Sequence, residues 1–97
     1  MRPVKRLEIV VETVELQKVI QLLVQVPVTS YTVIKDVVGC AERCMRDGDD
    51  LTDVITNVYV MAVCNADQVS EIVELLRPIL QRFGGTCLVS DAEWVIH

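Results

Sequence analysis

The 97-residue chain contains one histidine, His97, and no apolar run of the roughly 18 residues that a membrane-spanning helix needs. It also lacks a basic excess, because 9 lysines and arginines stand against 14 aspartates and glutamates, for a net charge of −5. A lone histidine disfavours a histidine-based catalytic triad or metal cluster. The acidic balance excludes the dense basic face that binds nucleic acid.

The first residues carry positive charge but are not followed by a signal-peptide core with a cleavage site. We therefore expect a cytoplasmic protein, in which the 4 cysteines are thiols and not a disulfide framework. Hydrophobic residues make up 52% of the chain, and we expect them to form one domain over residues 1–97. This is more apolar material than a lone small domain needs, so part of it is expected to be buried between subunits.

Strand patterns, which alternate or are wholly apolar, occur at residues 7–11, 30–38, 58–64, 86–90 and, as a short fifth, 94–96. The third of these is apolar at nearly every position, which indicates that both of its faces are covered. Between the strands, two segments repeat apolar residues at helical spacing.

The first helical segment follows Thr13, which we expect to cap it, and stops before Pro27. The second begins with a capping box formed by Asn65 and Gln68 and ends at Gly84–Gly85. The order strand–helix–strand therefore occurs twice, which predicts an α+β, ferredoxin-like βαββαβ sandwich. Both helices would cover one face of the sheet, and a second copy of the chain is the simplest cover for the other.

A polar segment over residues 39–57 separates the second and third strands. Loops of this length in a compact domain usually have a functional role. Gly39 permits close approach of the backbone to an anion, and the forked donors of Arg43 and Arg46 match phosphate or carboxylate oxygens. The segment fits either an anion-binding site or a solvated turn with surface arginines, and composition alone favours the turn.

Other features of the chain also have two interpretations. Cys40 and Cys44 are close enough for a disulfide if the segment turns, or for part of a soft-metal site, but reduced thiols are the simpler interpretation. The loop aspartates lack the terminal glutamate of a calcium loop and indicate a solvated acidic turn. The pair Gly84–Gly85 fits either close approach of a ligand or a simple helix end.

Several motifs, in this order and spacing, resemble the PII-like signal-transduction proteins across nearly the whole chain. They are residues 5–11, 31–34, 39–43, 46–54 and 88–96. The segment 46–54 is most similar to the branch associated with carboxysome and bicarbonate-transport operons.

The resemblance implies a ferredoxin-like homotrimer with its sheets turned inward and adenine-nucleotide sites in the clefts between subunits. In this branch, bicarbonate would bind beside the nucleotide. Residues 39–57 would correspond to the family's T-loop, which orders on ligand binding and docks onto a partner such as a membrane transporter or a carboxysome-related protein. The resemblance thus implies a regulator and not an enzyme, with no covalent cofactor and no metal.

The resemblance also implies a set of nucleotide-binding residues: Thr32 near the adenine, Gly39 and Ala41 at the loop base, Arg43 and Arg46 pairing with the anion, and Gly84 and Gly85 in the B-loop. Relatives usually carry glycine where this chain has Ala41 and Cys44, and the B-loop here is short and lacks a lysine. These departures favour AMP or ADP over ATP. The alternative is a redox- or metal-responsive sensor that uses Cys40 and Cys44 and has a degenerate nucleotide site.

Overall fold

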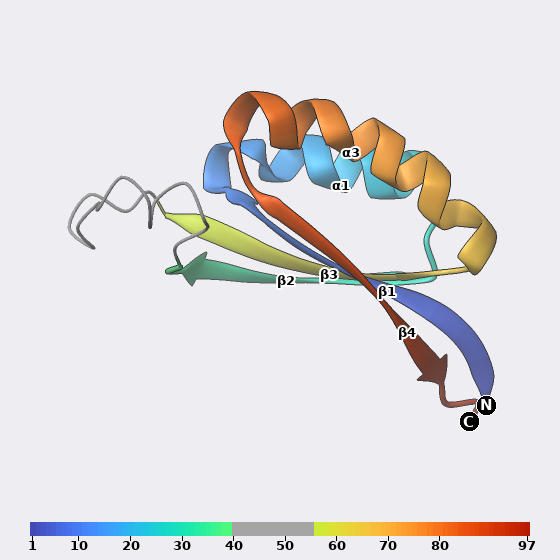
Figure 1. Cartoon of the computed structure of the whole chain (residues 1–97). Coiled ribbons are helices and arrows are strands. Elements are labelled where there is room, and N and C mark those ends of the chain that lie inside the picture. The colour runs from blue at the N-terminus through green and yellow to red at the C-terminus, as the bar shows by residue number, and fades with distance from the viewer. Residues whose placement is uncertain (40–55) are drawn as a thin grey trace.

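The computed structural model describes residues 1–39 and 56–97. Its elements are β1 (Arg2–Glu12), η1 (Thr13–Glu15), α1 (Leu16–Gln25), β2 (Ser30–Val37), β3 (Asn57–Cys64), η3 (Ala66–Gln68), α3 (Val69–Phe83) and β4 (Thr86–Trp94). The strands form one antiparallel sheet in the order β2-β3-β1-β4. Both helices cover the same face of this sheet (Figure 1), which confirms the predicted ferredoxin-like sandwich.

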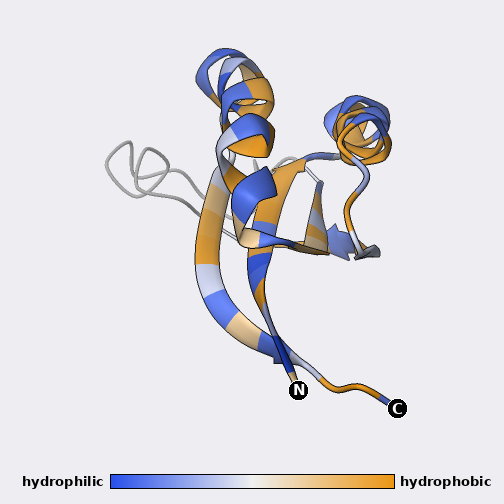
Figure 2. Cartoon of the chain, turned by 90° about the vertical axis from the view of Figure 1, so that its right-hand side faces the viewer, coloured by the Kyte–Doolittle hydropathy of each residue, from blue (hydrophilic) through white to orange (hydrophobic). Residues whose placement is uncertain are grey.

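The hydrophobic core lies between the helices and the face of the sheet that they cover, and an end-on view shows both helices on that side (Figure 2). Its buried side chains are Leu7, Ile9, Val11, Val19, Leu22, Leu23, Val26, Val58, Val60, Ala62, Cys64, Ile72 and Leu76. In β1 and β3 the buried side chains occupy every second position, because successive side chains of a strand point to opposite faces of the sheet. On each helix they form one stripe, as amphipathic packing requires.

The opposite face of the sheet, which we call the open face, is not covered by the helices. On β3, Val58 and Val60 on the helix side are fully buried, whereas Tyr59 and Met61 on the open face are only partly buried. Among the described residues, the largely apolar strand β3 is therefore covered on one face only, by the helices.

The start of the first helix differs from the prediction, and the start of the second agrees with it. The prediction that Thr13 caps α1 was wrong, because a 3-10 turn precedes the helix and the Thr13 hydroxyl donates to the carbonyl oxygen of Thr56 at 3.0 Å. Asn65 and Gln68 form both halves of the predicted capping box.

The prediction of a separate fifth strand over residues 94–96 was also wrong. β4 continues without interruption to Trp94 because β1 offers it a partner along its whole length, from Val10 opposite Thr86 to Arg2 opposite Trp94. The two strands form a ribbon that extends beyond the helices and brings the chain termini together (Figure 1).

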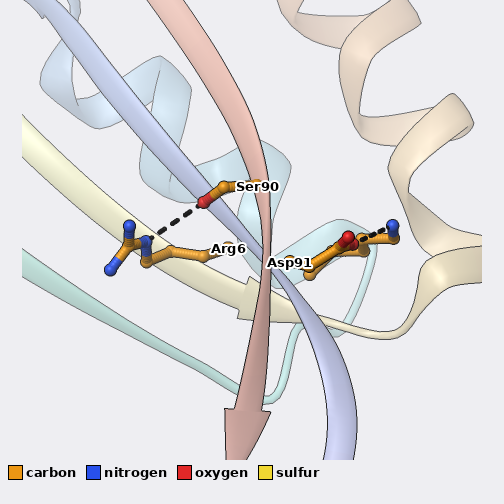
Figure 3. Close-up of polar contacts among 4 residues, drawn as sticks. Arg6, Ser90 and Asp91 are labelled. Atoms are coloured by element: carbon orange, nitrogen blue, oxygen red, sulfur yellow. Dashed lines mark hydrogen bonds and ion pairs between the residues drawn. The ribbon is translucent and has the colours of Figure 1, made fainter.

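Side-chain pairs on both faces of this ribbon join β1 to β4 (Figure 3). Arg6 Nε donates to Ser90 Oγ at 3.3 Å, and Lys5 forms an ion pair with Asp91. Cross-strand pairs of this kind stabilise the register of an antiparallel ribbon.

Candidate functional site

A pocket of about 340 Å³ opens at the end of the sheet, where β1 and β3 meet the junction of α3 and β4. It is lined by Val10, Glu12, Gly39, Asn57, Phe83, Gly84, Gly85 and Thr86. These residues are far apart in sequence. They meet because the end of β1 pairs with β3 on one side and with β4 on the other. Glu12 is opposite Asn57 on β3. Val10 is opposite Thr86 on β4.

Two glycines form the α3–β4 junction, and each has a backbone that favours glycine, with φ of 82° at Gly84 and 121° at Gly85. The Gly84 amide donates to the Leu80 carbonyl oxygen at 3.0 Å and ends α3, as predicted. A Cβ on Gly85 would lie 2.6 Å from the carbonyl oxygen of Val10, whereas a Cβ on Gly84 would meet nothing within 4 Å. Gly85 therefore permits the junction to pack directly on β1.

The pocket is also lined by one described residue on each side of segment 40–55. Gly39 precedes that segment, Asn57 follows it, and both line the pocket. Next to Asn57, the Thr56 carbonyl oxygen accepts hydrogen bonds from both the amide and the hydroxyl of Thr13, at 3.1 and 3.0 Å. Before Gly39, Asp36 has a left-handed φ of 59° at an irregularity in the β2–β3 pairing, which redirects the end of β2. A molecule in the pocket would thus contact residues on either side of the segment.

Charged side chains surround Phe83 on the helical side of the pocket. Lys18 Nζ lies 4.8 Å from the centre of the Phe83 ring, and Arg82 Cζ lies 5.3 Å from it. Glu15 is only 4% exposed, and its Oε2 lies 3.5 Å from Lys18 Nζ. Among the described residues that line the pocket, Glu12 alone carries a formal charge. The two cations therefore contact Phe83, but neither Lys18 nor Arg82 is among the residues that line the pocket.

The structure brings together Gly39, Gly84 and Gly85 from the predicted site. Thr32 lies in the middle of β2, opposite Met61, and does not line this pocket of the single chain. The other predicted residues lie outside the described part of the chain: Cys40, Ala41, Arg43, Cys44 and Arg46. Sequence analysis missed Glu12 and Phe83, which also line the pocket. Phe83 adjoins the predicted glycines, but no sequence pattern connects Glu12 to them.

The described cysteines are not arranged for thiol chemistry or metal binding. Burial raises the pKa of both the Cys64 and the Cys87 thiols, with a further contribution at Cys64 from the charge of Asp67. Across residues 1–39 and 56–97, histidine, cysteine and carboxylate side chains form no group of three that could hold a metal ion. In the same ranges, no helix has the length and hydrophobicity needed to cross a bilayer.

The open face combines exposed apolar side chains with a chain of polar contacts across β3, β1 and β4. Tyr59 Oη donates to Glu8 Oε1 at 2.7 Å, and Arg6 Nη2 lies 3.8 Å from Glu8 Oε2. The hydrogen bond to Glu8 raises the pKa of Tyr59 above its usual value. Beside these groups, Ile34 is 52% exposed and Leu88 is 65% exposed.

Comparison with solved structures supports the assignment of the fold. CPII, a nitrogen regulatory PII-like protein from Thiomonas intermedia K12 solved with ADP, AMP and bicarbonate, is similar with a TM-score of 0.82 and 20% identity, over 98% of this chain and 96% of CPII. CPII bound to ADP and bicarbonate has a TM-score of 0.78 and 26% identity, over 93% and 86% of the two chains. A Bacillus subtilis GlnK–ATP complex has a TM-score of 0.69 and 21% identity, over 95% and 84%.

Comparison of the sequence itself gives the family. No curated protein matches the chain. The model of the family described as nitrogen regulatory protein P-II matches residues 4–97, nearly the whole sequence. The chain therefore belongs to the P-II family of nitrogen regulatory proteins.

Proposed function

We propose that this chain is a single-domain, trimeric, cytoplasmic regulator that binds an adenine nucleotide in the pocket at the end of β1. It prefers ADP or AMP to ATP, binds bicarbonate beside the nucleotide, and catalyses no reaction. Within the family it would belong to the carboxysome- and bicarbonate-transport-associated branch, and its partner would be a transporter or a carboxysome-related protein. The CPII structures, which contain ADP, AMP and bicarbonate, support the choice of ligands.

The observation that carries this proposal is that residues on either side of segment 40–55 line one pocket. Gly39 and Asn57 both line it. A ligand in contact with both ends would bind one conformation of the segment more tightly than another, and so shift the population between them. If a partner recognises one conformation, the ligand and the partner are thermodynamically coupled.

The open face supports the trimer. Exposed apolar side chains such as Ile34 on β2 and Leu88 on β4 lie on it, and exposed apolar surface is typical of an interaction site. Thr32 lies opposite Met61, so it also belongs to the open face. Thr32 would therefore reach a nucleotide only in a cleft that a neighbouring subunit helps to form.

The proposed nucleotide-binding set is Thr32, Gly39, Ala41, Arg43, Arg46, Gly84 and Gly85. Isothermal titration calorimetry with AMP, ADP and ATP, each with and without bicarbonate, tests it, with GDP as the control for the base. We expect ADP or AMP to bind most tightly and light scattering to give a trimer. Failure of every adenine nucleotide to bind at millimolar concentration would reject the proposal.

Thiol titration of the same sample tests the alternative. Reversible pairing of Cys40 with Cys44 on oxidation, without nucleotide binding, would identify a redox-responsive sensor instead.

A further inference from the structure

We propose that Glu12 determines how much negative charge the ligand of the pocket carries. Its carboxylate disfavours each additional phosphate group, so that AMP and ADP bind more tightly than ATP. This inference rests on the proposed function, because it takes an adenine nucleotide as the ligand. It adds the residue of this chain that produces the preference.

The first step is the position of the Glu12 side chain. Val11 is buried on the helix side of β1, so its neighbours Val10 and Glu12 belong to the open face. Val10 is opposite Thr86 on β4, and Glu12 is opposite Asn57 on β3. Directly opposite residues of an antiparallel pair lie on the same face of the sheet. The residues Val10, Glu12, Asn57 and Thr86, which all line the pocket, therefore form one side of it.

The second step is the charge of the lining. Glu12 is the one residue with a formal charge among the described residues that line the pocket. Across residues 1–39 and 56–97, the ion pairs involve other carboxylates, namely those of Glu8, Glu15, Glu74 and Asp91. No described lysine or arginine therefore neutralises the carboxylate of Glu12.

The third step is the size of the pocket. A sphere with its volume of about 340 Å³ would be roughly 9 Å across, which is close to the Debye length of about 8 Å at physiological ionic strength. The carboxylate of Glu12 therefore interacts with a charge inside the pocket without full screening by salt. Each phosphate group that a nucleotide gains adds about one negative charge. The repulsion between Glu12 and the ligand should thus increase from AMP to ADP to ATP.

The remaining lining suits the uncharged part of a nucleotide. The side-chain amide of Asn57 both donates and accepts hydrogen bonds, and so does the hydroxyl of Thr86. Val10 and Phe83 offer apolar contact to a base or a ribose. The lining as a whole therefore opposes negative charge without opposing the nucleoside.

Calorimetry with AMP, ADP and ATP, without divalent cations, tests the role of Glu12 in the Glu12→Gln variant. Glutamine keeps the size of the side chain and removes its charge. We expect the ratio of the ATP dissociation constant to the AMP dissociation constant to fall about tenfold in E12Q. Adenosine, which lacks phosphate, should bind E12Q and the wild type alike.

The matched control is Glu74→Gln, which removes the same charge from the exposed side of α3. Glu74 pairs with Arg77 at 3.1 Å and does not line the pocket. E74Q should keep the ratio of the wild type, because its carboxylate is not at the pocket. A fall in the ratio in E74Q equal to that in E12Q would assign the preference to the net charge of the protein and overturn the inference.

The salt dependence of the wild type gives a second measurement. Added salt screens the repulsion, so the ratio of the ATP to the AMP dissociation constant should fall as the ionic strength rises. In E12Q the ratio should change less. Glu12 forms no side-chain hydrogen bond that caps the turn after β1, so E12Q is expected to fold, and circular dichroism checks this.

The outcomes separate this inference from the proposed function. If the wild type binds nucleotides and E12Q has the same ratio, the inference is overturned and nucleotide binding stands. A wild type that binds ATP as tightly as AMP also overturns it. So does an equal loss of every ligand in E12Q, adenosine included, since that result indicates a contact with the nucleoside. If the wild type binds no adenine nucleotide, the proposed function fails and the inference fails with it. Should E12Q not fold, the salt series decides, and a ratio that rises with salt overturns the inference.

Discussion

Thr13 and Thr56, which are 43 positions apart, meet through one carbonyl oxygen that accepts two hydrogen bonds. The Thr13 amide and hydroxyl both donate to the Thr56 carbonyl, at 3.1 and 3.0 Å. This contact fixes the residue that follows segment 40–55 to the turn between β1 and α1. Thr13 does not cap α1 because the 3-10 turn Thr13–Glu15 precedes the helix, whose N-cap position is Glu15.

Substitution of Thr13 by valine removes the hydroxyl donor. It keeps the size of the side chain and the backbone amide of residue 13. We expect a loss of about 1 kcal/mol in the free energy of unfolding, the usual net contribution of one hydrogen bond. Amide hydrogen exchange should become faster at residues 56–57. Thr13→Ser keeps the donor and is the control; equal exchange in the two variants would contradict the role assigned to the hydroxyl.

The two junction glycines should respond differently to alanine. In G85A the new Cβ would lie 2.6 Å from the Val10 carbonyl oxygen, at a φ of 121°, so we expect a destabilisation of about 3 kcal/mol or more. In G84A the Cβ meets nothing within 4 Å, and the left-handed backbone alone should cost about 1–2 kcal/mol. Denaturant unfolding of both variants measures the difference. Similar values for the two would show that the junction can shift away from β1.

The hydrogen bond from Tyr59 to Glu8 should make stability depend on alkaline pH. The pKa of Tyr59 is raised from 10.0, chiefly by this bond. The folded state therefore holds the phenol proton more tightly than the unfolded state. The associated stability is fully present below pH 10 and is lost as the pH rises through the raised pKa.

Spectrophotometric titration of the folded protein, after subtraction of the curve measured for Y59F, should show Tyr59 ionising at a higher pH than free tyrosine. In E8A, which removes both the hydrogen-bond acceptor and its charge, the ionisation should move back toward the ordinary value. An unchanged Tyr59 titration in E8A would assign the shift to burial instead.

A charge on the open face should prevent self-association. Leu88 lies opposite Glu8 on that face and is 65% exposed in the single chain. If subunits cover it, a lysine there would be desolvated at a cost of several kcal/mol, so L88K should shift the trimer to smaller species. Val24 on α1 is comparably exposed, at 64%, and V24K is the control. Light scattering measures both; a trimeric L88K would place the subunit interface elsewhere.

The features that sequence patterns predict correctly are those that depend on near neighbours or on repeated spacing. The capping box at Asn65 and Gln68 involves residues three apart, and it forms as predicted. The prediction for Thr13 failed because a 3-10 turn over Thr13–Glu15 precedes α1. The prediction of a fifth strand failed because a distant partner decided it: β1 extends β4 to Trp94. Local propensity does not contain such contacts.

The same distinction applies to the site. The glycines 39, 84 and 85 meet at one pocket, and the family resemblance already grouped them. The cluster of Lys18, Arg82 and Phe83 depends on how α1 packs beside α3, and no periodicity in either helix indicates it. Local sequence patterns do not predict long-range packing of this kind.

The 9-residue strand β4 has the pocket residue Thr86 at one end and Trp94, the sole indole of the chain, at the other. At about 3.3 Å per residue, the two ends are roughly 26 Å apart. Within one chain, the emission of Trp94 is consequently insensitive to direct contact with a molecule in the pocket. A change in that emission on adding an effector would report either a rearrangement along the ribbon or a contact between subunits.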